Sequence, residues 1–205
     1  MNQRQPMLAV IRGEPLDQVP FVQYDNMCAP SEIIWQALGA NSMGVLRWTT
    51  VHRVEHPHCR LVTEEALIDG KPGWRDTLIT PAGTLTQERM RVSGLGVSAY
   101  TKHYVESLSN YAVVRAYLRD AIVLPDLEPT VRAHRELGDH GLPHVALTRT
   151  PYQQMWVQWV AITDFCLHLA DDPGIVGECM DLMGQEVLRI AEVARQASRE
   201  TLIPY

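Results

Sequence analysis

Side chains that can do chemistry gather at three places in this sequence, and the first follows a short apolar run. Residues 19–24 have the pattern of a buried strand, and Tyr24, Asp25 and Asn26 stand at its carboxyl end. A carboxylate at the end of a strand can act as a base or bind a polar group of a ligand. Asp and Asn at such a place also close Asx-turns, and the sequence leaves both interpretations open.

The second place is residues 148–156, which follow another apolar run. Arg149 carries a forked guanidinium that can bind a carboxylate or a phosphate, and it can equally form a surface ion pair. Tyr152, Trp156 and Trp159 would wall an apolar pocket. Aromatic residues spaced three or four apart on a helix also pack into cores, and this second interpretation is favoured for Trp159.

The third place holds clustered imidazole and thiol groups, at His52, His56, His58 and Cys59. Zinc sites need three or four such ligands in one geometry. Only His56 and His58 would share a face of a strand, and Pro57 interrupts regular structure between them. We therefore predict no metal site in this chain. Nucleotide-binding, nucleophile-elbow and zinc-protease motifs do not occur, so motifs alone identify no catalytic residue.

Turn and periodicity signals predict the elements that position these residues. In the first part of the chain they predict a helix over 4–12 that ends at Gly13, a strand over 19–24, and a helix over 31–38. Ser31 is a candidate cap for the last of these, and Gly39 is its stop. Between 45 and 105, β-branched residues and two glycine turns predict an antiparallel meander of strands at 60–68, 74–80 and 84–92.

Helical and strand patterns alternate after residue 109, which predicts parallel βα units. Helices are expected to begin at Ser109 and Asp126, followed by a strand over 144–148 and a helix around 161–169. The clearest pattern is a last helix of more than twenty residues that starts at Pro173 behind the cap residue Asp172. Residues 201–205 resemble the beginning of a further strand.

Composition sets the limits on the class of protein. The chain has 205 residues, a net charge of −6 and 46% hydrophobic residues, as is typical of a globular protein with a real core. No basic stripe points to nucleic acid, and no run of about 18 apolar residues predicts a membrane span. Four cysteines without CxxC spacing indicate reduced thiols, so we expect a cytoplasmic protein. The length is roughly 50 residues short of a complete (β/α)8 barrel.

Three segments together resemble the uroporphyrinogen decarboxylase superfamily, over most of the chain and in the same order. Residues 7–21 are similar to the family's first helix and strand, residues 74–85 to the hairpin insertion of its methyltransferase-like branch, and residues 143–156 to a shared strand and Pro-aromatic turn. The resemblance implies an α/β fold: the N-terminal portion of a TIM-type barrel, as one incomplete domain over 1–205, with a β-hairpin insertion at 45–105.

The resemblance favours the methyltransferase-like branch over uroporphyrinogen decarboxylase itself. Decarboxylases carry an arginine-rich segment after the first strand, where this chain has residues 24–29 without an arginine, and their tyrosine would fall near Val157. The implied activity is transfer of a methyl group between a corrinoid and an acceptor, by a complete protein that uses zinc and a corrinoid protein partner. Zinc would be held by a His-x-Cys pair and a later Cys that this chain lacks, so no cofactor is expected within it. Decarboxylation in tetrapyrrole biosynthesis stays the alternative.

We expect one wall of a small-molecule pocket from the residues singled out above, namely Tyr24, Asp25, Asn26, Arg149, Tyr152 and Trp156. The chain alone is expected to lack the catalytic half of the enzyme. A second hypothesis is a truncated, non-catalytic binding or assembly module. Because an open part-barrel exposes strand edges and apolar faces, either form is expected to make a homo-oligomer or to pair with a complementary chain.

Overall fold

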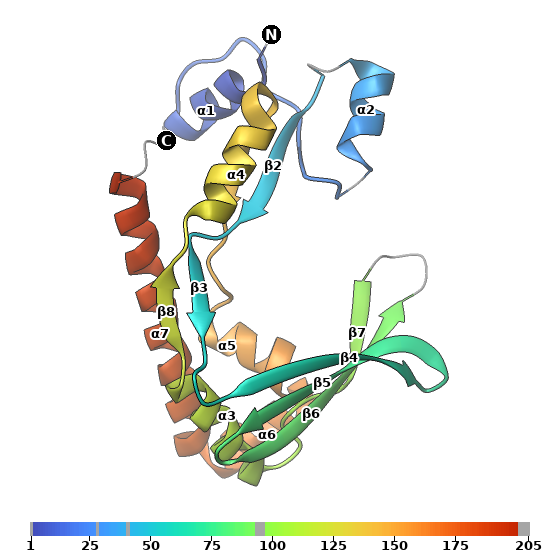
Figure 1. Cartoon of the computed structure of the whole chain (residues 1–205), viewed down its shortest axis with the longest axis vertical. Helices are drawn as coiled ribbons and strands as arrows, with labels where there is room; N and C mark the ends of the chain where they lie inside the picture. Colours follow the sequence, from blue (N-terminus) through green and yellow to red (C-terminus); the bar gives the residue numbers. More distant parts are fainter. Residues whose placement is uncertain (1, 28, 40–41, 93–96, 201–205) are drawn as a thin grey trace. The chain divides into compact units, whose positions relative to one another are not determined.

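The computed structural model describes residues 2–27, 29–39, 42–92 and 97–200, with side chains described through residue 197 (Figure 1). The chain divides into two compact units, and each is described by itself. Unit 1 comprises Met1–Arg53, Leu124–Leu147 and Ile190–Tyr205, and unit 2 comprises Val54–Val123 and Thr148–Arg189.

Unit 1 is built on a parallel sheet of three strands. The strands are β1 (Val22–Tyr24), β2 (Gly44–Thr49) and β9 (Gly141–Val145), and they lie side by side in that order. Helix α2 (Ser31–Leu38) joins β1 to β2, and α4 (Glu128–Leu137) precedes β9. Parallel neighbours need such crossover connections. The parallel βα units were expected after residue 109, but β1, α2 and β2 precede that residue, and of the later strands in the described residues β9 alone joins this sheet.

The helices of unit 1 cover both faces of this sheet, as the side chains that they contact along the strands show. On one face Met7 and Leu8 of α1 (Arg4–Arg12) pack against Leu142 and the half-buried Leu46. On the other face Val45 clusters with Leu137 of α4, and residues of α2 pack against the same cluster. Leu46 and Val45 are consecutive in β2, so their side chains point to opposite faces. The crossover helices therefore share one face, and α1 covers the other.

Unit 2 contains an antiparallel sheet in which each strand pairs with the next along the chain. Its strands are β4 (Arg60–Ile68), β5 (Lys71–Thr80), β6 (Gly83–Val92) and β7 (Val97–Lys102). The first turn has positive φ angles at Asp69 (49°) and Gly70 (74°), as a tight hairpin requires. The predicted meander is confirmed, and β7 extends it by one strand.

The meander begins at Arg60, as its predicted strands do, whereas residues 45–59 of the expected insertion range do not belong to it. Strand β2 lies in the parallel sheet, and β3 (His52–Glu55) pairs with β8 (Ile122–Pro125) in a two-stranded sheet. Strand β9 also begins earlier than expected, at Gly141 instead of residue 144, because Val45 of β2 pairs with Gly141. Residues 201–205, expected to start a strand, lie outside the described residues.

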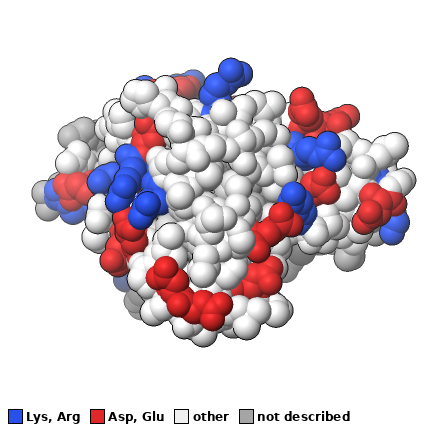
Figure 2. Space-filling model, turned by 90° about the horizontal axis from the view of Figure 1, so that it is seen from below, with Lys and Arg blue, Asp and Glu red and all other residues white. Residues whose placement is uncertain are grey.

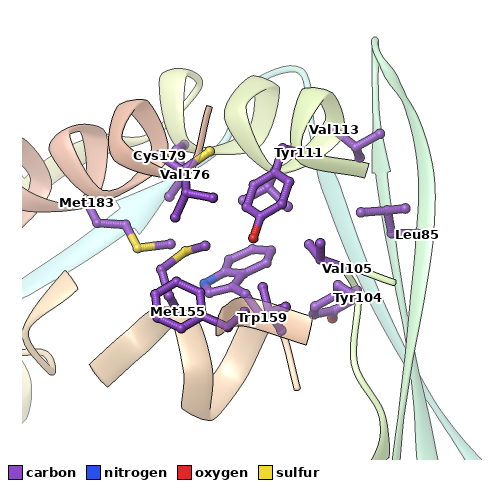
Figure 3. Close-up of a cluster of buried hydrophobic side chains, with 14 of the residues drawn as sticks. Leu85, Tyr104, Val105, Tyr111, Val113, Met155, Trp159, Val176, Cys179 and Met183 are labelled. Atoms are coloured by element: carbon purple, nitrogen blue, oxygen red, sulfur yellow. The ribbon is translucent and has the colours of Figure 1, made fainter. Parts of the chain in front are cut away.

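The helices of unit 2 enclose its main hydrophobic core. They are η1 (Leu108–Asn110), α3 (Tyr111–Arg119), α5 (Pro151–Gln154), the π-helical turn η3 (Met155–Trp159) and α6 (Ile162–Asp171); the short η2 (Gly138–His140) belongs to unit 1. Helix α7 (Pro173–Glu200) supplies residues to both units. Figure 3 shows Tyr111, Met155, Trp159 and Met183 pointing toward one another in this core.

Two predicted helix caps have different outcomes. Asp172 caps α7 as expected, because its Oδ1 accepts a hydrogen bond from the Ile175 amide at 3.1 Å. Ser31 is not a cap: it is the first residue of α2, after Pro30, and its hydroxyl group binds side chains at the end of β1 instead. Gly39 ends α2 as predicted, and its amide bonds the Trp35 carbonyl at 2.8 Å.

The fold is mixed α/β, and the described residues form no closed barrel. No helix in the described part of the chain is both long enough and apolar enough to cross a membrane.

On the face shown in Figure 2, Lys and Arg side chains lie beside Asp and Glu side chains. Cys59, Cys166 and Cys179 are free thiols, and Cys28 lies outside the described residues.

Candidate functional site

An aromatic cluster stands at the carboxyl ends of the parallel strands of unit 1. The rings of Tyr24 and Trp48 stack with their centroids 4.7 Å apart and their planes 16° from parallel. The His144 ring meets Trp48 edge-on, at 4.7 Å and 86°. Trp48 is nevertheless 56% exposed. Because a ring of this size is usually buried, an exposed stack at strand ends is a candidate binding platform.

Register explains why these three rings meet. Trp48 of β2 pairs with His144 of β9, and Tyr24 of β1 pairs with Leu46, two residues before Trp48. The three side chains therefore lie on the face that α1 covers further back along the strands. Of the three, the sequence predicted Tyr24 only.

An ion-pair network occupies the opposite face at the same strand ends. Arg47 donates from Nε to Asp25 Oδ2 at 2.7 Å and from Nη1 to Glu136 Oε2 at 2.5 Å. Asp25 Oδ1 accepts from the Ser31 hydroxyl at 3.2 Å, and that hydroxyl accepts from Gln23 Nε2 at 3.0 Å. Both Asp25 oxygens are thus engaged within the chain, and the charge of Arg47 is compensated by two carboxylates.

Asn26 has a structural contact at the turn after β1. Its φ angle is 59°, in the left-handed region that Asn tolerates, and its Oδ1 accepts from the Ser31 amide at 3.0 Å. This contact satisfies an amide that the first turn of α2 leaves open. Of the predicted triplet, Tyr24 therefore belongs to the aromatic platform, whereas the side chains of Asp25 and Asn26 form hydrogen bonds with Ser31 and, for Asp25, with Arg47.

The other predicted pocket residues, Arg149, Tyr152 and Trp156, belong to unit 2. Tyr152 is 51% exposed, meets Phe165 edge-on at 5.4 Å, and lines an open groove with Met180 and Leu188 of α7. Trp156 lies in η3, away from regular α-helical spacing. The structure thus brings Tyr24, Asp25 and Asn26 together in one unit and the remaining three in the other.

The histidine and cysteine cluster is dispersed by its own contacts. His56 stacks on Tyr117, with centroids 3.8 Å apart, and burial lowers its pKa. His58 binds Asp120 through its backbone amide and through Nδ1, each at 2.8 Å. Burial raises the pKa of the Cys59 thiol to about 11. Within the described residues, no group of three or more His, Cys, Asp or Glu side chains is arranged to hold a metal ion.

Unit 2 holds a polar pocket of about 230 Å³ that the sequence did not reveal. It lies on one face of the antiparallel sheet, against α3 and η3. Aromatic and polar side chains line it together: Leu61, Thr63, Asp76, Leu78, Gln87, Arg89, Tyr100, Tyr104, Tyr117, Gln158 and Trp159.

Asp76 lines this pocket and is only 5% exposed. Arg89 grips it with two hydrogen bonds, from Nε to Oδ2 at 2.8 Å and from Nη2 to Oδ1 at 3.1 Å. The Thr63 hydroxyl donates to Oδ1 at 2.7 Å. The hydrogen bond to Asp76 is the largest cause of a raised pKa at Arg89. The sequence did hold a signal for this pocket. Asp76 lies between Trp74 and Leu78 at every second position of the strand, so a charged side chain shares the inward face with two apolar ones.

Comparisons of this chain with family models, with curated proteins and with solved structures found no match.

Proposed function

We propose that this chain forms the first βα units of a barrel of the uroporphyrinogen decarboxylase superfamily and takes part in corrinoid-dependent methyl transfer. Strand order supports the proposal, because a singly wound barrel adds each parallel strand next to the previous one. Here β1, β2 and β9 follow chain order across the sheet. Helices α2 and α4 pack on the same face, as the outer helices of a barrel do.

The observation that carries the proposal is the exposed Tyr24–Trp48–His144 stack. It lies on the face away from the crossover helices, at the carboxyl ends of the strands. In a barrel this is the inner face at the catalytic end, where substrates bind. A flat aromatic platform suits a ligand with a broad apolar surface.

The charge of the site favours methyl transfer over porphyrinogen decarboxylation. A porphyrinogen with several carboxylates needs free guanidinium groups. The platform consists of Tyr24, Trp48 and His144, and the nearby Arg47 points to the opposite face, where Asp25 and Glu136 engage it. The zinc of the methyltransferase-like branch has no ligand set among the described residues, so no step of the reaction is assigned to it here. We assign to this chain the positioning of the methyl donor or acceptor against Trp48.

Binding measurements test this function. The chain is titrated by calorimetry with methylcobalamin, a free corrinoid, and separately with uroporphyrin I, which carries eight carboxylates. We expect methylcobalamin to bind, and Trp48→Ala to weaken binding by about tenfold, as the loss of an aromatic stack predicts. Leu38→Ala is the control and should leave the affinity unchanged, because it shortens an exposed side chain (68%) of α2, which packs on the opposite face of the sheet.

Two outcomes would contradict the proposal. If methylcobalamin does not bind, or if Leu38→Ala weakens binding as much as Trp48→Ala, the stack in unit 1 is not its platform. If uroporphyrin I binds in preference and Trp48→Ala abolishes that binding, the site belongs to a decarboxylase instead.

A further inference from the structure

The polar pocket of unit 2 is assembled by strand register on one face of the sheet. Thr63 pairs with Asp76, Asp76 pairs with Gln87, and Arg89 pairs with Tyr100, so all five side chains face the same way. Residues Leu78 and Leu85, on the same face, are buried in the core that α3 covers. The pocket is therefore the part of this face that the core leaves open.

Two backbone irregularities border the pocket. The register between β6 and β7 shifts between Glu88 and Arg89, next to the guanidinium that grips Asp76. The π-helical turn η3 ends at Trp159, and its Gln158 carbonyl accepts a hydrogen bond from Gln87. Bulges and π-helical turns both occur often beside binding sites, where they redirect a side chain.

The carboxylate of Asp76 is used within the pocket, whereas several donors are not. Both Asp76 oxygens are engaged by Arg89 and Thr63. Arg89 Nη1 has no hydrogen-bond partner in the described part of the chain. The hydroxyl groups of Tyr104 and Tyr117 likewise have none among the described residues, and the indole nitrogen of Trp159 is a buried donor without an acceptor there.

The tyrosine hydroxyl groups stay protonated across the physiological range. Burial raises the pKa of Tyr117 to about 12, and burial together with the charge of Asp76 raises the pKa of Tyr104 further. A protonated hydroxyl can donate, so these groups add donors to the unpaired N–H groups of Arg89.

We propose that this pocket binds a small organic carboxylate whose flat body lies against Tyr104 and Trp159 and whose oxygens accept hydrogen bonds from Arg89 and the tyrosine hydroxyl groups. The rings of Tyr104 and Trp159, 5.3 Å apart, supply the apolar wall. Three hydrogen bonds already occupy the Asp76 carboxylate, which leaves an ammonium ligand one of its about four lone-pair positions. A carboxylate instead complements the donors left open on Arg89 and the two tyrosines. The site lies within unit 2 and does not depend on the function proposed for the Trp48 platform.

Three benzene derivatives of matched shape test the proposal: benzoate, the neutral benzamide and the cationic benzylamine. We expect calorimetry or ligand-observed NMR to show saturable binding of benzoate, and binding at least tenfold weaker for the other two. Tyr104→Phe removes one donor and keeps the ring, so benzoate should bind about tenfold more weakly. Tyr111→Phe is the control, since the Tyr111 hydroxyl contacts His168 in the core, and it should leave benzoate binding unchanged.

Each variant is checked for folding by its thermal unfolding before the titration. Tyr117→Phe is the second variant and should weaken benzoate in the same way, so the proposal stays testable if Tyr104→Phe does not fold. The proposal is overturned if benzoate does not bind, if benzamide binds as well as benzoate, or if Tyr111→Phe weakens binding as much as Tyr104→Phe.

Discussion

Removing the charge of Asp76 tests whether the buried ion pair holds the antiparallel sheet of unit 2 together. Asp76→Asn keeps the shape of the side chain. It replaces the carboxylate that accepts two hydrogen bonds from Arg89 and one from Thr63. The asparagine nitrogen then faces a donor, and Arg89 keeps a charge without its partner.

The structure sets the size of the expected effect. Removing one partner of a buried ion pair costs about 3–5 kcal/mol. The Arg89 side chain is 28% exposed and can gain some hydration, so we expect the lower end, about 3 kcal/mol in the free energy of unfolding. The control lies on the opposite face of the same two strands, where Arg75 binds Glu88 at 2.8 Å and both side chains reach solvent, with 48% and 23% exposed against 28% and 7% for Arg89 and Asp76. Glu88→Gln should cost about 0–1 kcal/mol, as exposed pairs do.

The assay is urea unfolding followed by tryptophan fluorescence and by circular dichroism, with the slope of the transition compared among wild type and both variants. The reasoning is refuted if Asp76→Asn and Glu88→Gln lower the free energy of unfolding equally, or if Asp76→Asn has no effect. Either result would mean that burial of Asp76 adds nothing to the pair.

Three other substitutions give expectations of different sign. Gly141→Ala should destabilise the parallel sheet by about 3 kcal/mol, because a Cβ there would lie 2.2 Å from the Val45 carbonyl oxygen. Gly177→Ala should stabilise the protein by about 0.5–1 kcal/mol, because it lies in α7 with nothing near its Cβ position. Thermal unfolding measures both changes. Burial raises the pKa of Glu186 above 4.5, so its contribution to stability is present at acidic pH and is lost as the pH rises through the folded pKa. Glu186→Gln should therefore raise the melting temperature at pH 7 and not below about pH 4, and an equal gain at both would contradict this sign.

Local patterns were enough to predict the longest elements. The 3.6-residue period marks α7 from Pro173, and the Asp69-Gly70 turn fixes the hairpin of β4 and β5. Strand β8 was missed because four residues, Ile122–Pro125, are too short a run for periodicity to resolve between two helices. Strand β2 was assigned to the meander range because its β-branched and aromatic residues do not show which sheet they join.

The candidate sites were harder to predict because their members come from distant parts of the chain. Tyr24 could be singled out from its place after a strand, but its partners Trp48 and His144 follow from the register of three parallel strands. The Asp76–Arg89 pair is more local. Once the turn at residues 80–83 is placed, hairpin register puts both on one face. The face that becomes the pocket depends on the packing of α3, which sequence alone does not give.

Both sites neutralise an arginine with carboxylates of the same chain, and the difference between them decides what each can bind. Arg47 pairs through two of its nitrogens with two carboxylates, so this network, on the face opposite the aromatic platform, carries a formal charge of minus one that disfavours a further anion. Arg89 is held by one carboxylate through two of its nitrogens and keeps the third. A guanidinium has five N–H donors, so a single bidentate partner leaves donors for an anion. We therefore expect the platform of unit 1 to select for apolar surface and the pocket of unit 2 to select for a carboxylate.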